Sequence, residues 1–247
     1  MPEQIWRLVS VLFTALAFGL GFREHKNAGE LLLFAGALAV AVVIANWYQT
    51  RSLRFGERLY DAGLPVLFLF GYFGTLAAVS APSMKVVVAA LGAGIFYLFE
   101  LYLPSTHPRA VGEVTVLTTG FLFQVTLWAG NFFFLLPWWA LMCAVFTFSS
   151  GLFFLMFVNR DLDGKNALFW ALICALVQVE IAWAVFFWPV HFLTAAVTNF
   201  ACFYILFIVS SMHFEGRLHK KGVYFQIILI LIVLLMSLLS SPWSPLQ

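Results

Sequence analysis

The sequence contains little charge. Only 10% of its 247 residues are Asp, Glu, Lys or Arg, whereas 63% are hydrophobic and 18% are aromatic. So few polar side chains cannot cover the surface of a water-soluble globular protein, so lipid must solvate much of the surface. The formal net charge is only +2 and no basic block interrupts the chain. This composition excludes a nucleic-acid partner.

Closely spaced cysteines and the motifs of soluble enzymes are also absent. The three cysteines, Cys143, Cys174 and Cys202, lie far apart within apolar runs, so they predict neither a disulfide framework nor a CxxC metal or redox site. The sequence has no Walker motif and no glycine-rich dinucleotide fingerprint. We therefore predict no cofactor and no metal.

Apolar runs separated by charged clusters make up the chain instead. Each run has about the 20 residues that a helix needs to cross a bilayer. The runs predict an all-α fold, a polytopic transmembrane helical bundle of about nine spans in a single domain. The predicted spans are residues 5–21, 29–48, 61–79, 84–103, 114–130, 138–158, 166–187, 190–211 and 223–240. A signal peptide is the alternative for the first run, but Glu3 ahead of it favours a retained helix.

The basic residues indicate how these spans are oriented. Lys and Arg accumulate on the cytoplasmic side of membrane proteins. With the N-terminus inside, the inner segments hold ten of the 13 basic residues and the outer segments hold three. We therefore predict a cytoplasmic N-terminus and an outside C-terminus, in the plasma (inner) membrane of a cell.

One carboxylate lies deep within apolar sequence. Between Asn166 and Ser211 the only formal charge is that of Glu180, and Trp188 and Pro189 mark the turn of a helical hairpin. A carboxylate at the middle of a membrane costs at least about 2.5 kcal/mol on insertion scales. We therefore expect Glu180 to face the interior of the bundle.

Two amides and a histidine complete the predicted site. In this hairpin Asn199 comes to nearly the depth of Glu180, and Gln124 lies about 15 Å into its own span. His191 begins the eighth span, where an interfacial cap and a ligand are the alternative roles. The predicted substrate-binding or proton-binding residues are Glu180, Asn199, Gln124 and His191. We predict no catalytic residue and no metal ligand.

The turn of the hairpin resembles a short element of an enzyme family. Residues Phe187 to His191 read FWPVH and resemble the FxxxH element of the CAAX-type intramembrane proteases, which would imply an intramembrane enzyme. That family also has paired glutamates followed by arginine upstream, and a later histidine near an Asn or Asp. This chain has neither in the matching context.

The C-terminal end has a second resemblance. The residues that carry it are Glu180, Trp183, Phe187, Trp188, Pro189, His213, Gly216, Leu218, Lys220 and Lys221. Over about 80 residues, this end of the chain resembles the end of uncharacterised polytopic membrane proteins of candidate-phyla bacteria. It implies a multi-pass membrane protein and no established activity.

Three functions fit these observations. The first is a small transporter or lipid-handling protein with a mid-membrane site around Glu180. The second is a structural or assembly subunit in which Glu180 links buried helices. The third and least favoured is an intramembrane enzyme that uses Glu180 and His191. The expected partners are membrane lipids and either another protein or a second copy of the chain.

Native mass spectrometry of the wild type and Glu180→Gln, extracted in nanodiscs, tests these hypotheses. A transporter or lipid-handling site at Glu180 predicts a bound small molecule or lipid that the folded variant loses. Equal bulk lipid, with a difference only in stability or in a co-purifying protein, would favour the structural subunit. An enzyme requires a product that disappears with either Glu180→Gln or His191→Ala.

Overall fold

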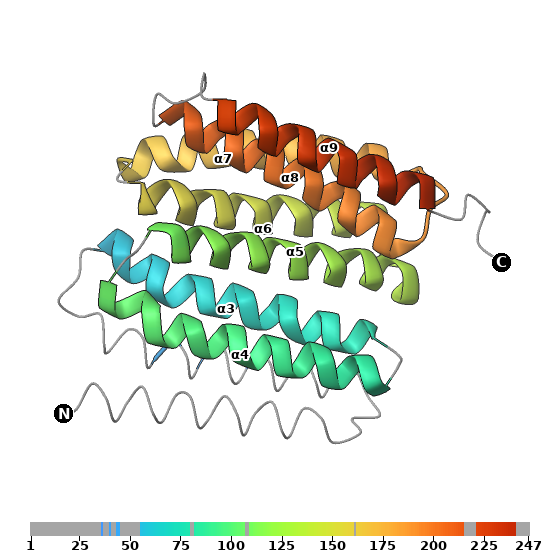
Figure 1. Cartoon of the computed structure of the whole chain (residues 1–247), viewed down its shortest axis with the longest axis horizontal. Coiled ribbons are helices and arrows are strands. Elements are labelled where there is room, and N and C mark those ends of the chain that lie inside the picture. The colour runs from blue at the N-terminus through green and yellow to red at the C-terminus, as the bar shows by residue number, and fades with distance from the viewer. Residues whose placement is uncertain are drawn as a thin grey trace. The chain divides into compact units, whose positions relative to one another are not determined.

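A computed structural model describes residues 55–79, 82–106, 109–160, 162–214 and 221–240, together with Gly36, Val40, Val43 and Ile44. This described part is all-α, with helices and no strand. The helices are α3 (Phe55–Ala78), α4 (Pro82–Thr106), α5 (Arg109–Phe134), α6 (Trp138–Asn159), α7 (Gly164–Phe186), α8 (Phe192–Phe214) and α9 (Lys221–Ser240), as Figure 1 shows.

Each predicted span between residues 61 and 240 falls on one of these helices, with ends that differ by no more than six residues. Four helices, α5 to α8, are long and apolar enough to cross a membrane. Within the described residues, the other apolar helical stretches are shorter: Gly63–Ala78, Ser83–Phe96 and Tyr224–Leu239. The predicted spans 5–21 and 29–48 lie outside the described residues, apart from four helical positions. Nine spans and the orientation of the termini therefore stay predictions.

The chain divides into two compact units. Unit 1 comprises Met1–Phe123 with Val158–Arg160, and unit 2 comprises Gln124–Phe157 with Asp161–Gln247. Helix α5 contributes to both units, because the boundary falls between Phe123 and Gln124.

Aromatic packing between α3 and α4 forms the described core of unit 1. Phe68 stacks on Tyr72 with ring centroids 6.1 Å apart, and Phe96 of α4 lies 6.1 Å from Phe68. Gly92 of α4 faces the ring of Tyr72 so closely that a Cβ at this position would overlap it. The missing side chain of Gly92 therefore sets how closely α3 and α4 approach.

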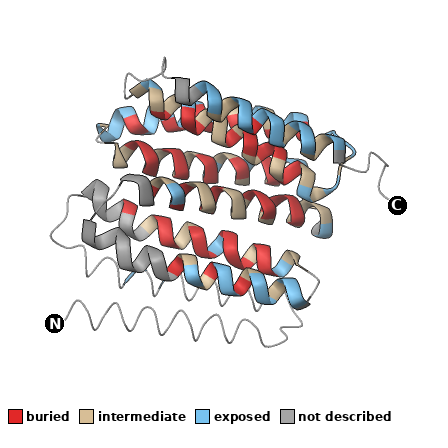
Figure 2. Ribbon diagram, in the orientation of Figure 1, coloured by how far each residue is buried: buried red, intermediate tan, exposed pale blue. Residues whose placement is uncertain are grey.

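Helix α8 is the centre of unit 2. It packs against α7 and α9. Its Phe203 lies 4.8 Å from Phe153 of α6, and its Phe192 lies 5.4 Å from Phe132 of α5, between ring centroids. Figure 2 shows buried residues along most of α6, whereas α9 is largely exposed.

The buried residues of α7 recur at spacings of three and four, which places them on one face of the helix. They are Ala167, Ala171, Cys174, Ala175, Gln178, Ala182 and Val185. Most are small, and small side chains let helix backbones approach closely where lipid offers no hydrophobic driving force. The opposite face of α7 carries large exposed apolar side chains, including Leu176 and Trp183.

The linker between α5 and α6 is tight. Leu135 follows the last residue of α5 with φ of 50°, the left-handed conformation that commonly ends a helix and that usually falls to glycine. Leu136 folds back onto α5, where its Cδ1 lies 3.3 Å from the place that a Cβ at Gly130 would occupy. Pro137 then accepts the first backbone hydrogen bonds of α6.

Two glycines of α4 provide a matched pair for testing the core of unit 1. Gly92→Ala would drive a methyl group into the buried ring of Tyr72, and such overpacking typically costs about 1–3 kcal/mol. A Cβ at Gly94 meets nothing within 4 Å. We expect Gly92→Ala to lower the free energy of unfolding in a detergent titration and Gly94→Ala to leave it unchanged or slightly higher. Equal values for the two variants would contradict the described α3–α4 packing.

Candidate functional site

Three buried amide side chains meet at the centre of unit 2, one from each of three helices. Asn199 Nδ2 of α8 donates a hydrogen bond to Gln124 Oε1 of α5 at 2.7 Å. Gln178 Nε2 of α7 donates to both Oδ1 and the backbone oxygen of Asn199 at 2.8 Å. Gln124 is 2% exposed, and the other two residues are fully buried. We call these three residues the amide triad.

The hydrogen bonds of the amide triad run in one direction. Gln178 Nε2 lies against two acceptor oxygens, so the reverse orientation of its amide would bring oxygen against oxygen. Its Oε1 therefore lies on the other side, where it has no hydrogen-bond partner within the described residues. An amide does not ionise, so the triad can link helices and orient a polar group but cannot carry a proton as a carboxylate can.

The prediction that Glu180 faces the interior is wrong. Its side chain is exposed, whereas Gln178 and Asn199 are buried. Successive helical residues are about 100° apart, so Gln178 and Glu180 lie about 200° apart around α7. Equal depth along the hairpin therefore does not indicate whether a side chain faces the interior or the surface. Gln124 and Asn199, two of the predicted site residues, are brought together, and Glu180 is not part of their hydrogen-bonded group.

Sequence reasoning missed Gln178, although a signal for it exists. Ala171, Cys174 and Ala182 form a stripe of small residues at helical spacing, and Gln178 lies in register with them. A polar residue on the small-residue face of a membrane helix is placed to bond to a neighbouring helix. Glu180 instead lies in line with Leu176 and Trp183, which are large and exposed.

His191 acts as a cap for α8. Its Nδ1 accepts a hydrogen bond from the backbone N–H of Leu193 at 3.3 Å, one of the donors that the start of a helix leaves without an intrahelical partner. Its ring lies 4.4 Å from Phe192 and 5.5 Å from Phe132, between centroids. This contact favours the cap over the ligand alternative and places His191 beside an aromatic cluster.

A cavity of about 260 Å³ lies at this end of unit 2. Its walls come from the last turns of α5 and α7, the α5–α6 linker, the turn between α7 and α8, and the start of α8. Five of its eleven lining residues are aromatic: Trp128, Phe132, Phe186, Trp188 and Phe192. Asn131 is the only amide among them. We call this space the hairpin cavity.

The hairpin cavity begins about one helical turn from the amide triad. Trp128 is four residues after Gln124 on α5, and Ala195, which also lines the cavity, is four residues before Asn199 on α8. Four residues correspond to about 6 Å along a helix. The triad therefore holds α5 and α8 together directly beside two walls of the cavity.

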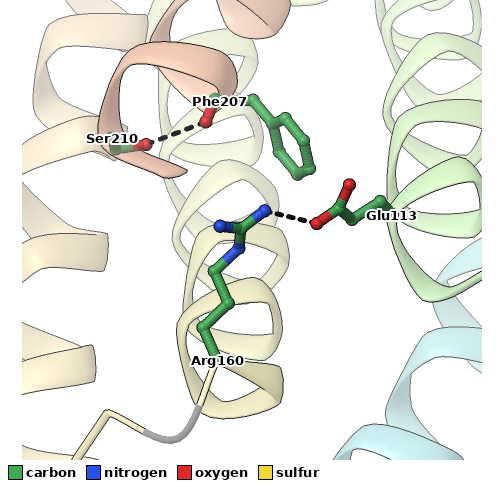
Figure 3. A network of polar contacts seen from close by, with 4 residues as sticks. All are labelled: Glu113, Arg160, Phe207 and Ser210. Atoms are coloured by element: carbon green, nitrogen blue, oxygen red, sulfur yellow. Dashed lines mark hydrogen bonds and ion pairs between the residues drawn. The ribbon is translucent and has the colours of Figure 1, made fainter. Parts of the chain in front are cut away.

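Unit 1 contains a separate polar contact. The guanidinium of Arg160 donates to Glu113 Oε1 of α5, as Figure 3 shows. The Arg160 side chain is 7% exposed and that of Glu113 is 34% exposed. The contact therefore gives the buried Arg160 guanidinium a partner of opposite charge, which a buried cation requires.

The described residues contain no group of three or more His, Cys, Asp or Glu side chains that could hold a metal ion. The cysteines are free thiols. Within the described part of the chain, the amide triad and the hairpin cavity are therefore the candidate features for binding a ligand.

A family model described as "Protein of unknown function (DUF5656)" matches residues 64–240. This range contains the amide triad, the hairpin cavity and Glu180. No curated protein and no solved structure matches the chain.

Asn199→Ala tests whether the amide triad stabilises unit 2. The change leaves Gln124 Oε1 without its donor in an apolar interior, which costs about 1–3 kcal/mol, and Gln178 Nε2 keeps only its bond to the backbone oxygen of residue 199. We expect a lower free energy of unfolding in a detergent titration. Asn166→Ala is the matched control, because Asn166 is exposed on α7. Equal stability of the two variants would show that the triad does not stabilise the fold.

Proposed function

This chain belongs to the DUF5656 family, a family of unknown function, and from its site we propose that it is a multi-pass membrane protein that handles lipids. The hairpin cavity carries the proposal. It is larger than the cavity of about 150 Å³ that holds benzene, and slightly smaller than pockets of about 300 Å³ or more that take drug-sized ligands. Its volume suits one head group or one chain segment, with the rest of the lipid outside.

The position of the hairpin cavity supports this proposal. Trp138, Trp139 and Trp188 are exposed at the same end of unit 2, and exposed tryptophans gather where lipid head groups meet acyl chains. Five aromatic lining residues offer flat apolar surface to a lipid. A lipid at this depth reaches the cavity without crossing water.

We also propose the number of spans, their orientation and the membrane in which the whole chain lies. Four helices are long and apolar enough to cross a membrane, and the remaining predicted spans bring the total to about nine. The excess of basic residues supports a cytoplasmic N-terminus and an outside C-terminus. Short loops favour the plasma membrane of a bacterium as the location.

Glu180 does not line the hairpin cavity. A lipid held in that cavity should therefore remain bound when Glu180 is replaced by glutamine. Proton-coupled transport through Glu180 would instead require this carboxylate to join the amide triad, from which it faces away. We therefore favour lipid handling over proton-coupled transport.

An assembly subunit is the second candidate, and the position of Glu180 favours it. The carboxylate lies among exposed apolar side chains, Leu176, Trp183 and Phe187, and lipid is a poor solvent for it. A protein partner that covers this face of α7 would relieve the cost. Loss of a co-purifying protein in Glu180→Gln, with no change in bound lipid, would support this candidate.

Val190→Trp tests the lipid proposal by filling the hairpin cavity. Val190 lines the cavity from the turn between α7 and α8, so a larger side chain there avoids the helix interfaces. Leu193→Trp is the control, because Leu193 is exposed and does not line the cavity. Native mass spectrometry of the full chain should detect a bound lipid in the wild type and in Leu193→Trp, and little or none in Val190→Trp. Wild-type protein free of bound lipid would overturn the proposal.

A further inference from the structure

The lining of the hairpin cavity carries no charge. None of its eleven described residues is Asp, Glu, Lys or Arg. The titratable side chain of the adjoining turn, His191, does not line the cavity, and its Nδ1 accepts the Leu193 N–H. Asp163 and Lys165 lie at the opposite end of α7. An anionic head group in the cavity would find no cation among the described lining residues to compensate its loss of water.

One residue of the cavity wall has a buried donor that lacks an acceptor within the described residues. Trp128 is 3% exposed and lines the cavity, and its indole nitrogen has no hydrogen-bond partner within the described residues. An indole N–H can only donate. Asn131 adds an amide on the same helix, one turn nearer the end of α5. A ligand with an acceptor oxygen would satisfy the indole N–H of Trp128.

We infer that the hairpin cavity selects an uncharged lipid whose head group carries a carbonyl oxygen. The carbonyl would accept the hydrogen bond of Trp128 once the indole turns its buried N–H toward the cavity, and the apolar chain would leave through the open side of the cavity. An ester of an acylglycerol and the ring of a prenyl quinone share this chemistry. This inference rests on the proposed lipid function and adds the class of lipid to it.

Two probes with the same chains test the charge selection. Dioctanoylglycerol and dioctanoyl phosphatidylglycerol differ by the phosphate-bearing head group alone, and a short-chain prenyl quinone represents the other carbonyl source. Affinities of the full chain in nanodiscs are measured by native mass spectrometry in titrations. We expect the uncharged diacylglycerol or the quinone to bind at least about ten-fold more tightly than the anionic lipid. Whichever of the two binds more tightly identifies the carbonyl source.

Trp128→Phe tests the hydrogen bond, because it keeps an aromatic ring and removes the N–H. The net value of one hydrogen bond predicts about a two- to twelve-fold loss of affinity for the uncharged probe. Trp139→Phe is the matched control, because Trp139 is exposed and does not line the cavity. Affinity of Trp128→Phe equal to the wild type would overturn the inference. If Trp128→Phe fails to fold, the ratio of the two wild-type affinities decides alone.

The outcomes separate this inference from the proposed function. Equal binding of the two dioctanoyl lipids, or tighter binding of the anionic one, would overturn the uncharged class and leave lipid handling intact. Binding of none of the three probes, together with wild-type protein free of bound lipid, would overturn the proposed function itself.

Discussion

The hydrogen bonds of Asn199 are the contact on which the described part of unit 2 depends. Inside a membrane no water is present to satisfy a polar group, so each amide must find its partner within the protein. Asn199 of α8 does this with Gln124 of α5 and Gln178 of α7. Helix α8 also packs against α6 and α9. Asn199 therefore belongs to the helix that contacts all the other described helices of unit 2, and its side chain joins that helix to α5 and α7.

The same contact positions the hairpin cavity. Trp128 and Ala195 lie one turn beyond the triad on α5 and α8, so the cavity walls begin where the helices are already tied together. An aromatic cavity with an uncharged described lining, at the end of hydrogen-bonded helices, suits a ligand that reaches it from the bilayer. The buried amides hold the helices together, and the end of the hairpin provides the space for a ligand.

The existence and approximate ends of the described helices could be predicted from sequence. Apolar runs of about 20 residues have few alternatives to a helix in lipid, and each predicted span from 61–79 onward coincides with a helix. That Gln124 and Asn199 lie at a similar level of their helices was also predictable, because the rise per helical residue is constant. Both residues are found in the same hydrogen-bonded group.

The sequence by itself determined composition, helical runs and the depth of each polar residue along its helix. Only the tertiary structure decided which way each side chain faces. Glu180 and Gln178 have nearly the same depth, yet one is exposed and the other is fully buried. Depth follows from counting residues along a helix, whereas facing depends on which neighbours pack against it. The hairpin cavity has the same origin, because its lining joins three helix ends and two connecting segments that only packing brings together.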